Sequence, residues 1–162
     1  IHDVTKDLGL QVVLEPGRVI AGNAGVMVTE VLYHKPAPDR TFMIVDAGMN
    51  DLMRPALYQA HHDIVPVVQP TANVAQTEYD IVGPICESTD KFAAKREMPV
   101  VEPGERIAFM SSGAYGAVLS SQYNARSLVA EVLVDGDQFA VVRRRPSFEQ
   151  MIELEQMPDW LT

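Results

Sequence analysis

Short apolar runs, each interrupted within a few residues by proline or glycine, are the feature that most limits the fold of this chain. Its 162 residues include 11 prolines and 10 glycines, spread along the whole length. Proline removes a backbone donor and glycine weakens regular structure, so a long helix cannot run through these positions. The β-rich runs lie at residues 10–14, 26–33, 41–46, 64–69, 76–82 and 106–110. This pattern predicts a mainly β domain, a barrel or a sandwich with only brief helices.

The C-terminal third holds the clearest local signals. Glu131–Arg143 contains two alternating apolar runs separated by Asp135-Gly136, which is typical of a β-hairpin with a two-residue turn. Ser147 is followed three residues later by Gln150, the spacing of a capping box. We therefore expect a short helix to begin at this serine.

Size, charge and cysteine content restrict the function class. One domain with its own core is expected, because 47% of the residues are hydrophobic. The net charge of −9 argues against nucleic-acid binding, which needs a surplus of lysine and arginine. A single cysteine cannot form an internal disulfide, so a reducing, cytoplasmic location is expected. The adjacent His61 and His62 do not predict a metal site, because no third ligand is spaced to complete one.

A carboxylate and a guanidinium flank the turn that ends the first apolar run. We expect Leu10–Leu14 to be a buried strand, closed by Glu15-Pro16-Gly17 and followed by Arg18. Side chains at the end of a buried strand can face a ligand, and Gly17 would let the backbone approach it closely. A surface turn with an ordinary ion pair explains the same residues, and these four residues alone do not decide.

Arg54 and Tyr58 lie four residues apart, so they would share one face of a short helix. Asn50 or Asp51 is expected to cap this helix, with Pro55 in its first turn. An arginine fork with a phenol above it could hold a carboxylate through two hydrogen bonds. A solvated arginine beside a half-buried tyrosine is an equal alternative on spacing alone.

Two further segments place reactive groups among turn residues. Cys86 and Glu87 follow Gly83-Pro84, which predicts a loop, and a thiol in a polar loop is available for chemistry. A buried cysteine that merely packs is the alternative. Tyr115 stands between glycines after a predicted strand, where its phenol could meet a phosphate or simply pack in a turn.

Taken together and in order, these segments resemble the pyridoxal-phosphate-dependent decarboxylases with an alanine-racemase-like fold. The likeness rests on LEPGRVIAGNAGVMVTEVLYHK (14–35), DAGMNDLMRPALYQAHH (46–62), VGPICESTD (82–90) and GAYG (113–116). Each fragment is weak alone, whereas their ordered sum is strong. The likeness is greatest to the branch that decarboxylates meso-2,6-diaminopimelate to L-lysine and CO2, the last step of lysine biosynthesis.

The resemblance implies a larger architecture. Members of this family have an N-terminal (β/α)8 barrel that carries the cofactor lysine, followed by a β-domain. Residues 1–24 resemble the end of that barrel with its last strand, and residues 25–162 resemble the C-terminal β-domain. The abrupt start at Ile1, without an initiating methionine, fits a fragment. The fragment alone is therefore expected to be inactive, because no lysine in it matches the family's lysine motif.

The resemblance also implies a pyridoxal 5'-phosphate site. By position, Glu15 resembles the carboxylate that faces the pyridine nitrogen and keeps it protonated, so that the ring can accept an electron pair. Gly17 resembles the backbone donor to the cofactor phosphate. Tyr115 resembles the phenol near that phosphate.

Substrate roles are implied for five more positions. Arg18, Arg54 and Tyr58 resemble the groups that hold the substrate's carboxylates. Cys86 resembles a proton donor in the chemical step, a general-acid role, and Glu87 would hold the distal ammonium group. In this family the cysteine loop reaches the partner subunit's site, which implies a homodimer with shared active sites.

Two alternatives stay open at this point. The chain could belong to a decarboxylase of a related diamino acid, such as ornithine, arginine or carboxynorspermidine. Ornithine decarboxylases typically have Cys-Asp where this chain has Cys-Glu. Arg18 and Arg54 also favour a substrate with carboxylates at both ends. The chain could also be a β-domain that binds a partner and catalyses nothing.

Overall fold

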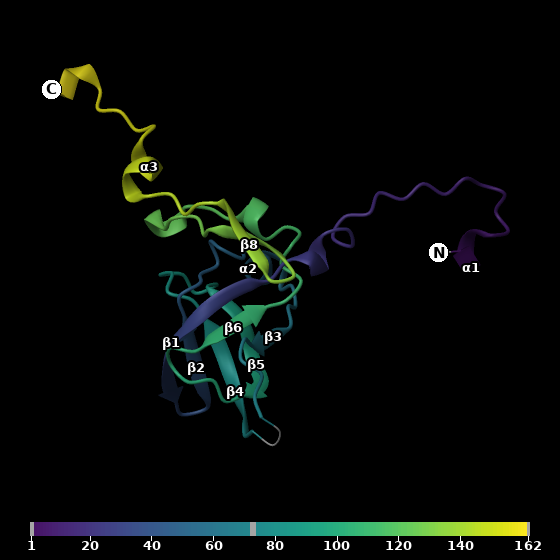
Figure 1. Ribbon diagram of the computed structural model, residues 1–162, viewed down its shortest axis with the longest axis horizontal. Coiled ribbons are helices and arrows are strands. Elements are labelled where there is room, and N and C mark those ends of the chain that lie inside the picture. Colours follow the sequence, from purple (N-terminus) through teal and green to yellow (C-terminus); the bar gives the residue numbers. More distant parts are fainter. Residues whose placement is uncertain (1, 72–73, 162) are drawn as a thin grey trace.

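The computed structural model describes residues 2–71 and 74–161, and six strands in it form one curled sheet (Figure 1). The strand order is β3-β6-β1-β2-β4-β5. Neighbouring strands are antiparallel, except that β2 pairs with β4 in parallel. The six strands are β1 (Met27–Ala37), β2 (Arg40–Val45), β3 (Ile64–Pro66), β4 (Gln76–Val82), β5 (Lys91–Pro99) and β6 (Arg106–Phe109). The predicted mainly β, barrel-like fold is confirmed.

The core lies inside this curled sheet. Alternate residues of each strand point to opposite faces, and the inward set is almost wholly apolar. Phe109 is fully buried, and its ring centroid lies 4.7 Å from that of Phe92. Burying one such side chain contributes about 1.5–3 kcal/mol. The other fully buried apolar side chains include Val31, Met43, Val45, Ile81 and Ile107.

Several local predictions are confirmed. The hairpin consists of β7 (Glu131–Asp135) and β8 (Gln138–Arg143), and Gly136 in its turn has a φ of 60°. Ser147 caps α3 (Phe148–Ile152) with the complete capping box. The Ser147 hydroxyl accepts from the Gln150 amide, and the Gln150 side chain accepts from the Ser147 amide at 2.9 Å.

The prediction of a buried strand at Leu10–Leu14 is wrong for this structure. These residues form no strand, and Leu10 and Val13 are 71% and 77% exposed. A strand needs a neighbour with which to exchange backbone hydrogen bonds, and no described strand lies against this segment. Apolar composition without a partner strand therefore leaves the segment extended in solvent.

Three strands differ from the sequence pattern, and one of them, β3, ends at Pro66 although its run was predicted to reach residue 69. β1 continues through Pro36 to Ala37, where the prolines predicted a break, because the turn comes only at Pro38 and Asp39. β5 was not predicted, since most of its side chains are polar or exposed and only Phe92 and Met98 are buried. β5 pairs with β4 and also contacts α2, and its place is set by this pairing, not by hydrophobic alternation.

The helical elements are short. They are α1 (His2–Thr5), η1 (Gly22–Ala24), α2 (Arg54–Tyr58), η2 (Ala117–Leu119), η3 (Tyr123–Ala125), α3 and η4 (Asp159–Leu161). Within residues 2–71 and 74–161, no helix has the length and apolar character needed to cross a membrane. Figure 1 shows the N-terminal segment and the segment after β8 extending away from the sheet.

Candidate active site

Two loops that are distant in sequence meet at one end of the sheet. The amide of Ser112 donates to the carbonyl of Gly25 at 2.8 Å, and the amide of Gly113 donates to the carbonyl of Gly22 at 3.0 Å. The approach is so close that a Cβ atom on Gly113 would lie 2.1 Å from the Ala21 carbonyl oxygen. Only glycine fits there. This contact joins the turn after Glu15 to the loop that carries Tyr115.

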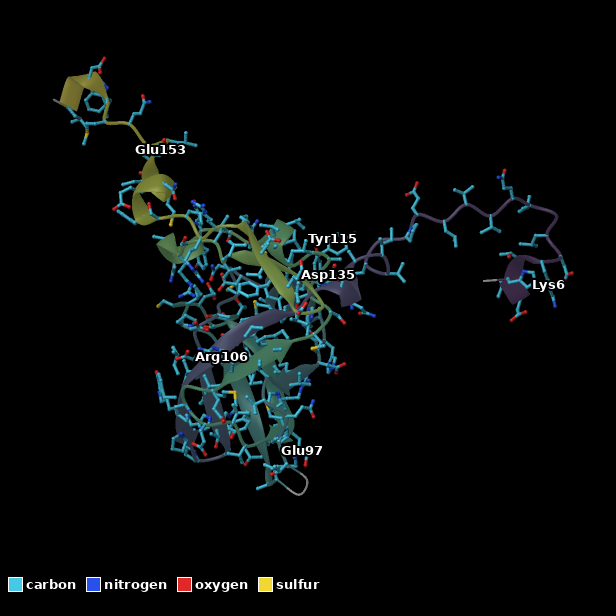
Figure 2. All side chains as sticks on the ribbon, viewed as in Figure 1. Lys6, Glu97, Arg106, Tyr115, Asp135 and Glu153 are labelled. Atoms are coloured by element: carbon cyan, nitrogen blue, oxygen red, sulfur yellow. The ribbon has the colours of Figure 1, made fainter. Side chains whose placement is uncertain are left out.

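Tyr115 faces Gly17 across this junction. A Cβ atom on Gly17 would lie 3.2 Å from the Tyr115 hydroxyl oxygen, so the bare backbone and the phenol are neighbours. Tyr115 has a φ of 57°, a left-handed conformation that is uncommon for an aromatic residue and that recurs at functional sites. Its side chain lies at the end of the sheet opposite to Glu97 (Figure 2).

Arg54 lies between two phenol rings. Its guanidinium carbon is 5.6 Å from the ring centroid of Tyr58 and 5.6 Å from that of Tyr115. Both distances fit cation–π contacts. The buried Nε of Arg54 has no hydrogen-bond partner among the described residues. The arrangement presents a partly desolvated cation that can bind an anionic group.

Arg18 and Glu15 differ in how the structure holds them. The carbonyl of Arg18 accepts from the Gly22 amide at 2.7 Å, and its side chain passes 3.7 Å from the position that a Cβ atom on Gly22 would take. Glu15 lies in the exposed segment before Gly17. The structure thus brings Gly17, Arg18, Arg54, Tyr58 and Tyr115 to one end of the sheet, whereas it places Glu15 outside this packing.

The turn before α2 is not the helix cap that was predicted. Met53 is the N-cap residue of α2, without a side-chain cap. Asn50 and Asp51 are instead buried and bonded to each other, with the Asn50 amide donating to Asp51 Oδ1 at 2.9 Å. Arg126 Nε donates to Asn50 Oδ1 at 3.1 Å, and its Nη2 lies 3.6 Å from Asp51 Oδ2. A buried carboxylate and amide require such partners, which a local cap rule does not supply.

Cys86 and Glu87 are exposed in a turn between β4 and β5, as the loop prediction stated. Asp90 closes this turn and also bonds to the amide of Met49, two residues from Asp51. A pocket of about 330 Å³ lies at this contact. Its lining consists of Met49, Asn50, Met53, Glu87, Ser121 and Tyr123. The cysteine loop therefore lies beside the turn that leads into α2.

His62 is a buried residue that the sequence analysis did not select for the site. Its ring Nδ1 lies 2.8 Å from the Met110 carbonyl oxygen, just before the loop that carries Tyr115. Burial lowers the pKa of His62 below its usual value of 6.5, and the nearby Arg18 and Arg54 lower it further. Within the described part of the chain, no three His, Cys, Asp or Glu side chains cluster in a way that could hold a metal ion.

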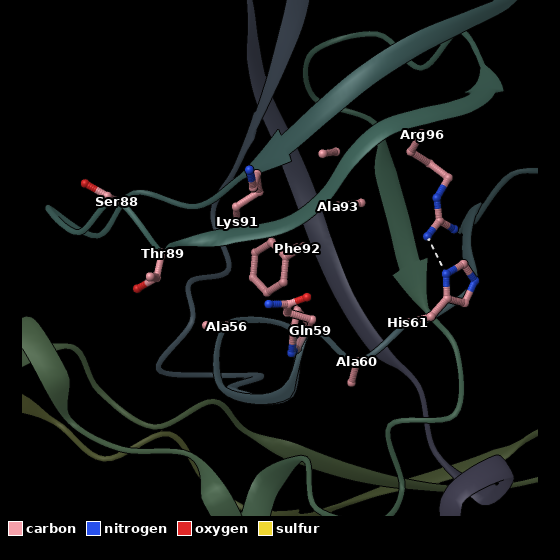
Figure 3. A pocket seen from close by; sticks show the side chains of 12 residues that line it. Ala56, Gln59, Ala60, His61, Ser88, Thr89, Lys91, Phe92, Ala93 and Arg96 are labelled. Carbon is pink, nitrogen blue, oxygen red and sulfur yellow. Dashed lines mark hydrogen bonds between the residues drawn. The ribbon is translucent and has the colours of Figure 1, made fainter.

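A larger pocket of about 530 Å³ lies between α2 and β5 (Figure 3). At one end of it, Arg96 Nη2 lies 3.2 Å from His61 Nδ1, and the Phe92 ring forms part of its wall. None of the predicted site residues lines it. The pocket adjoins the cysteine turn through Ser88 and Thr89, but the junction of Gly17 and Tyr115 does not line it.

Comparison with known proteins decides the family. Residues 7–113 match the family model described as "Pyridoxal-dependent decarboxylase, C-terminal sheet domain". The chain belongs to the pyridoxal-dependent decarboxylases. The cofactor of this family is pyridoxal 5'-phosphate, and the matched region is the family's sheet domain, in agreement with the curled sheet.

Among its relatives, the chain is similar to the diaminopimelate decarboxylases of Zymomonas mobilis and Pseudomonas fluorescens. Identity is 45% over 161 residues and 51% over 152 residues, covering 99% and 94% of this chain. The chain spans only 38% and 35% of the length of those two proteins.

A solved structure of Helicobacter pylori diaminopimelate decarboxylase complexed with L-lysine superposes with a TM-score of 0.80 at 40% identity. It covers 94% of this chain, and the match spans 37% of that chain.

Proposed function

We propose that this chain is the C-terminal part of an enzyme that decarboxylates meso-2,6-diaminopimelate to L-lysine and CO2. The observation that carries the proposal is the contact of the Arg54 guanidinium with the rings of Tyr58 and Tyr115, since the Tyr115 hydroxyl also neighbours Gly17. The relatives support the same activity, since diaminopimelate decarboxylases match at 41–51% identity. In this proposal residues 1–24 end a (β/α)8 barrel, and residues 25–162 form the β-domain.

The junction of Gly17 and Tyr115 fits the phosphate end of pyridoxal phosphate. A bare backbone and a phenol hydroxyl meet there, so both an amide donor and a hydroxyl donor can approach one anion. Glu15 is two residues away and its side chain is exposed, free to face the pyridine nitrogen. When bound, the cofactor supplies the electron sink for loss of CO2. Glu15, Gly17 and Tyr115 would hold it and set its charge.

The remaining site residues would bind the substrate. Arg18, Arg54 and Tyr58 would hold its carboxylates through charge-assisted hydrogen bonds. Glu87 would bind the distal ammonium group, and Cys86 would donate a proton in the chemical step. The exposure of Cys86 and Glu87 in their turn supports these roles, because both side chains are accessible.

The proposal includes the assembly of the enzyme. The site would be shared across a homodimer, with the cysteine loop of one subunit serving the other, and the enzyme would be cytoplasmic. The 162-residue chain alone would be inactive, because no lysine in it matches the family's cofactor-binding motif. Mixing a full-length Cys86→Ala variant with one that lacks the cofactor lysine would then restore activity through mixed dimers.

The decisive experiment measures kcat/KM of the full-length protein on meso-diaminopimelate, ornithine, arginine and carboxynorspermidine. We expect meso-diaminopimelate to be preferred by about 10- to 100-fold, because loss of a partner for a buried charged group costs about 1.5–3 kcal/mol. Arg54→Leu should lower kcat/KM about 10- to 100-fold. The matched control is Arg106→Leu, since the Arg106 side chain is exposed and forms an ion pair with Glu30 at the surface. Preference for ornithine would refute the assignment.

A further inference from the structure

The cysteine turn is closed by one buried side chain. Asp90 is 4% exposed, and its Oδ2 accepts a hydrogen bond from the Ile85 amide at 2.6 Å. The turn's backbone adds three bonds, from Gly83 N to Asp90 O, from Glu87 N to Ile85 O and from Asp90 N to Glu87 O, at 2.8–3.1 Å. The two residues of proposed chemical importance, Cys86 and Glu87, are the tip of this bonded turn.

The same carboxylate packs directly on the start of the turn. A Cβ atom on Gly83 would lie 2.4 Å and 2.6 Å from the two carboxylate oxygens of Asp90. Only glycine allows this approach. Ile85 is 6% exposed, so its side chain anchors the turn in apolar surroundings while Cys86 remains exposed. The turn is thus held by close packing as well as by hydrogen bonds.

The other oxygen of Asp90 reaches a different part of the chain. Asp90 Oδ1 accepts from the Met49 amide at 2.7 Å. Met49 precedes the buried pair of Asn50 and Asp51, which Arg126 holds in place, and α2 with Arg54 follows directly. One carboxylate therefore ties the cysteine turn to the turn that leads into the helix of Arg54.

We propose that Asp90 is a positioning residue that fixes Cys86 and Glu87 relative to the helix of Arg54. The inference rests on the proposed function, in which those residues meet the same substrate. A carboxylate suits this role because its two oxygens accept from two amides at once, whereas an asparagine side chain can satisfy only one of them. The second group of an asparagine side chain is NH2, a donor, which would face a backbone amide that is also a donor.

The role is separable from ordinary stabilisation. Burial raises the pKa of Asp90, because desolvation disfavours the ionised carboxylate. The hydrogen bonds from the Ile85 and Met49 amides and the charge of Arg126 lower this pKa, whereas Asp51 raises it further. Asparagine escapes that penalty, but its NH2 group would face an amide donor and leave it unsatisfied, so Asp90→Asn should lower the free energy of unfolding while it releases the turn.

The test compares Asp90→Asn with Asp80→Asn in the full-length holoenzyme. Asp80 is also buried and also accepts from a backbone amide, that of Lys95 at 2.8 Å, but it lies within β4 and pairs with Arg40 at 3.2 Å, not with the cysteine turn. We expect Asp90→Asn to lower kcat about 10- to 100-fold, since small misplacement of reacting groups has effects of that order. Asp80→Asn should leave kcat within about 2-fold.

Two further measurements separate positioning from general damage. Amide hydrogen exchange across residues 84–90 should be faster in Asp90→Asn than in wild type and unchanged in Asp80→Asn. In a Cys86→Ala background, adding Asp90→Asn should lower kcat by less than about 3-fold, because residues that act as a unit are not additive. If the asparagine variant does not fold, Asp90→Ser replaces it, with the same expectations.

The outcomes distinguish this inference from the proposed function. Unchanged exchange in residues 84–90, or full additivity of Asp90→Asn with Cys86→Ala, would overturn the positioning role. If the full-length protein prefers another diamino acid, the proposed substrate is wrong. The exchange measurement needs no substrate, so faster exchange in Asp90→Asn would still support the positioning of the turn.

Discussion

The six-stranded sheet and the segments that flank it contain similar apolar residues, but the sheet buries them and the flanking segments leave them exposed. In the sheet, Phe109 is fully buried, and in the hairpin of β7 and β8, Phe139 is 77% exposed. Leu133 and Val134, neighbours on opposite faces of that hairpin, are 64% and 65% exposed. Two strands without a second layer have nothing to pack against, so alternation alone does not produce burial.

The sheet packs its apolar side chains against one another, whereas the flanks, the segments before β1 and after β6, have exposed apolar side chains. The sheet satisfies its own apolar face, whereas the hairpin and residues such as Leu10 and Ile20 leave theirs in solvent. The chain spans 38% of the length of its Zymomonas mobilis relative. In the longer enzyme proposed above, these flanks would have packing partners, and three measurements test the difference between the sheet and its flanks.

The largest effect on stability is expected from a cavity in the core of the six-stranded sheet. Phe109→Ala should lower the free energy of unfolding of the 162-residue chain by about 3–5 kcal/mol, because it removes a fully buried ring that contacts Phe92. Urea denaturation followed by circular dichroism measures this. A loss below about 1 kcal/mol would mean that the sheet is not the stable unit.

A smaller, pH-dependent effect is expected from His62. Its pKa is lowered in the folded state, so the unfolded chain binds the proton more readily. The contribution of the neutral His62 to stability is therefore fully present above about pH 6.5 and is lost as the pH drops below that value. His62→Gln should remove this dependence between pH 7 and pH 5, as measured by denaturation at each pH.

His61→Gln is the control for that measurement. His61 is the adjacent residue, but its side chain is 69% exposed. The pH dependence should survive in this variant. Its loss on substitution of His61, with His62 intact, would show that burial is not the cause.

The smallest effect is expected in the hairpin. Phe139→Ala should change the stability of the 162-residue chain by less than about 0.5 kcal/mol, as for other exposed positions. In the full-length protein the same substitution should have a larger effect if the hairpin is covered there. Thermal unfolding of both proteins measures the difference, and equal effects would contradict the inference about the flanks.

Much of the site was predictable as segments but not as an arrangement. The sequence pattern identified the turn at Gly17, the helix of Arg54 and Tyr58, the cysteine loop and Tyr115. It did not show that Tyr115 contacts Arg54 as well, because these two residues are about 60 positions apart. The roles of Asp90, Arg126 and His62 were missed for the same reason, since each depends on partners far along the chain.

By itself, the sequence determined what depends on neighbouring residues. The hairpin turn at Asp135-Gly136, the capping box at Ser147 and the lengths of most strands follow from local backbone preference and side-chain alternation. Only the tertiary structure decided which apolar runs are buried, which polar groups pair and that Arg54, Tyr58 and Tyr115 lie in contact. Burial and pairing of polar groups depend on surfaces that folding brings together. The exposure of the Leu10–Leu14 run and the burial of Asp90 therefore could not be predicted before the fold was known.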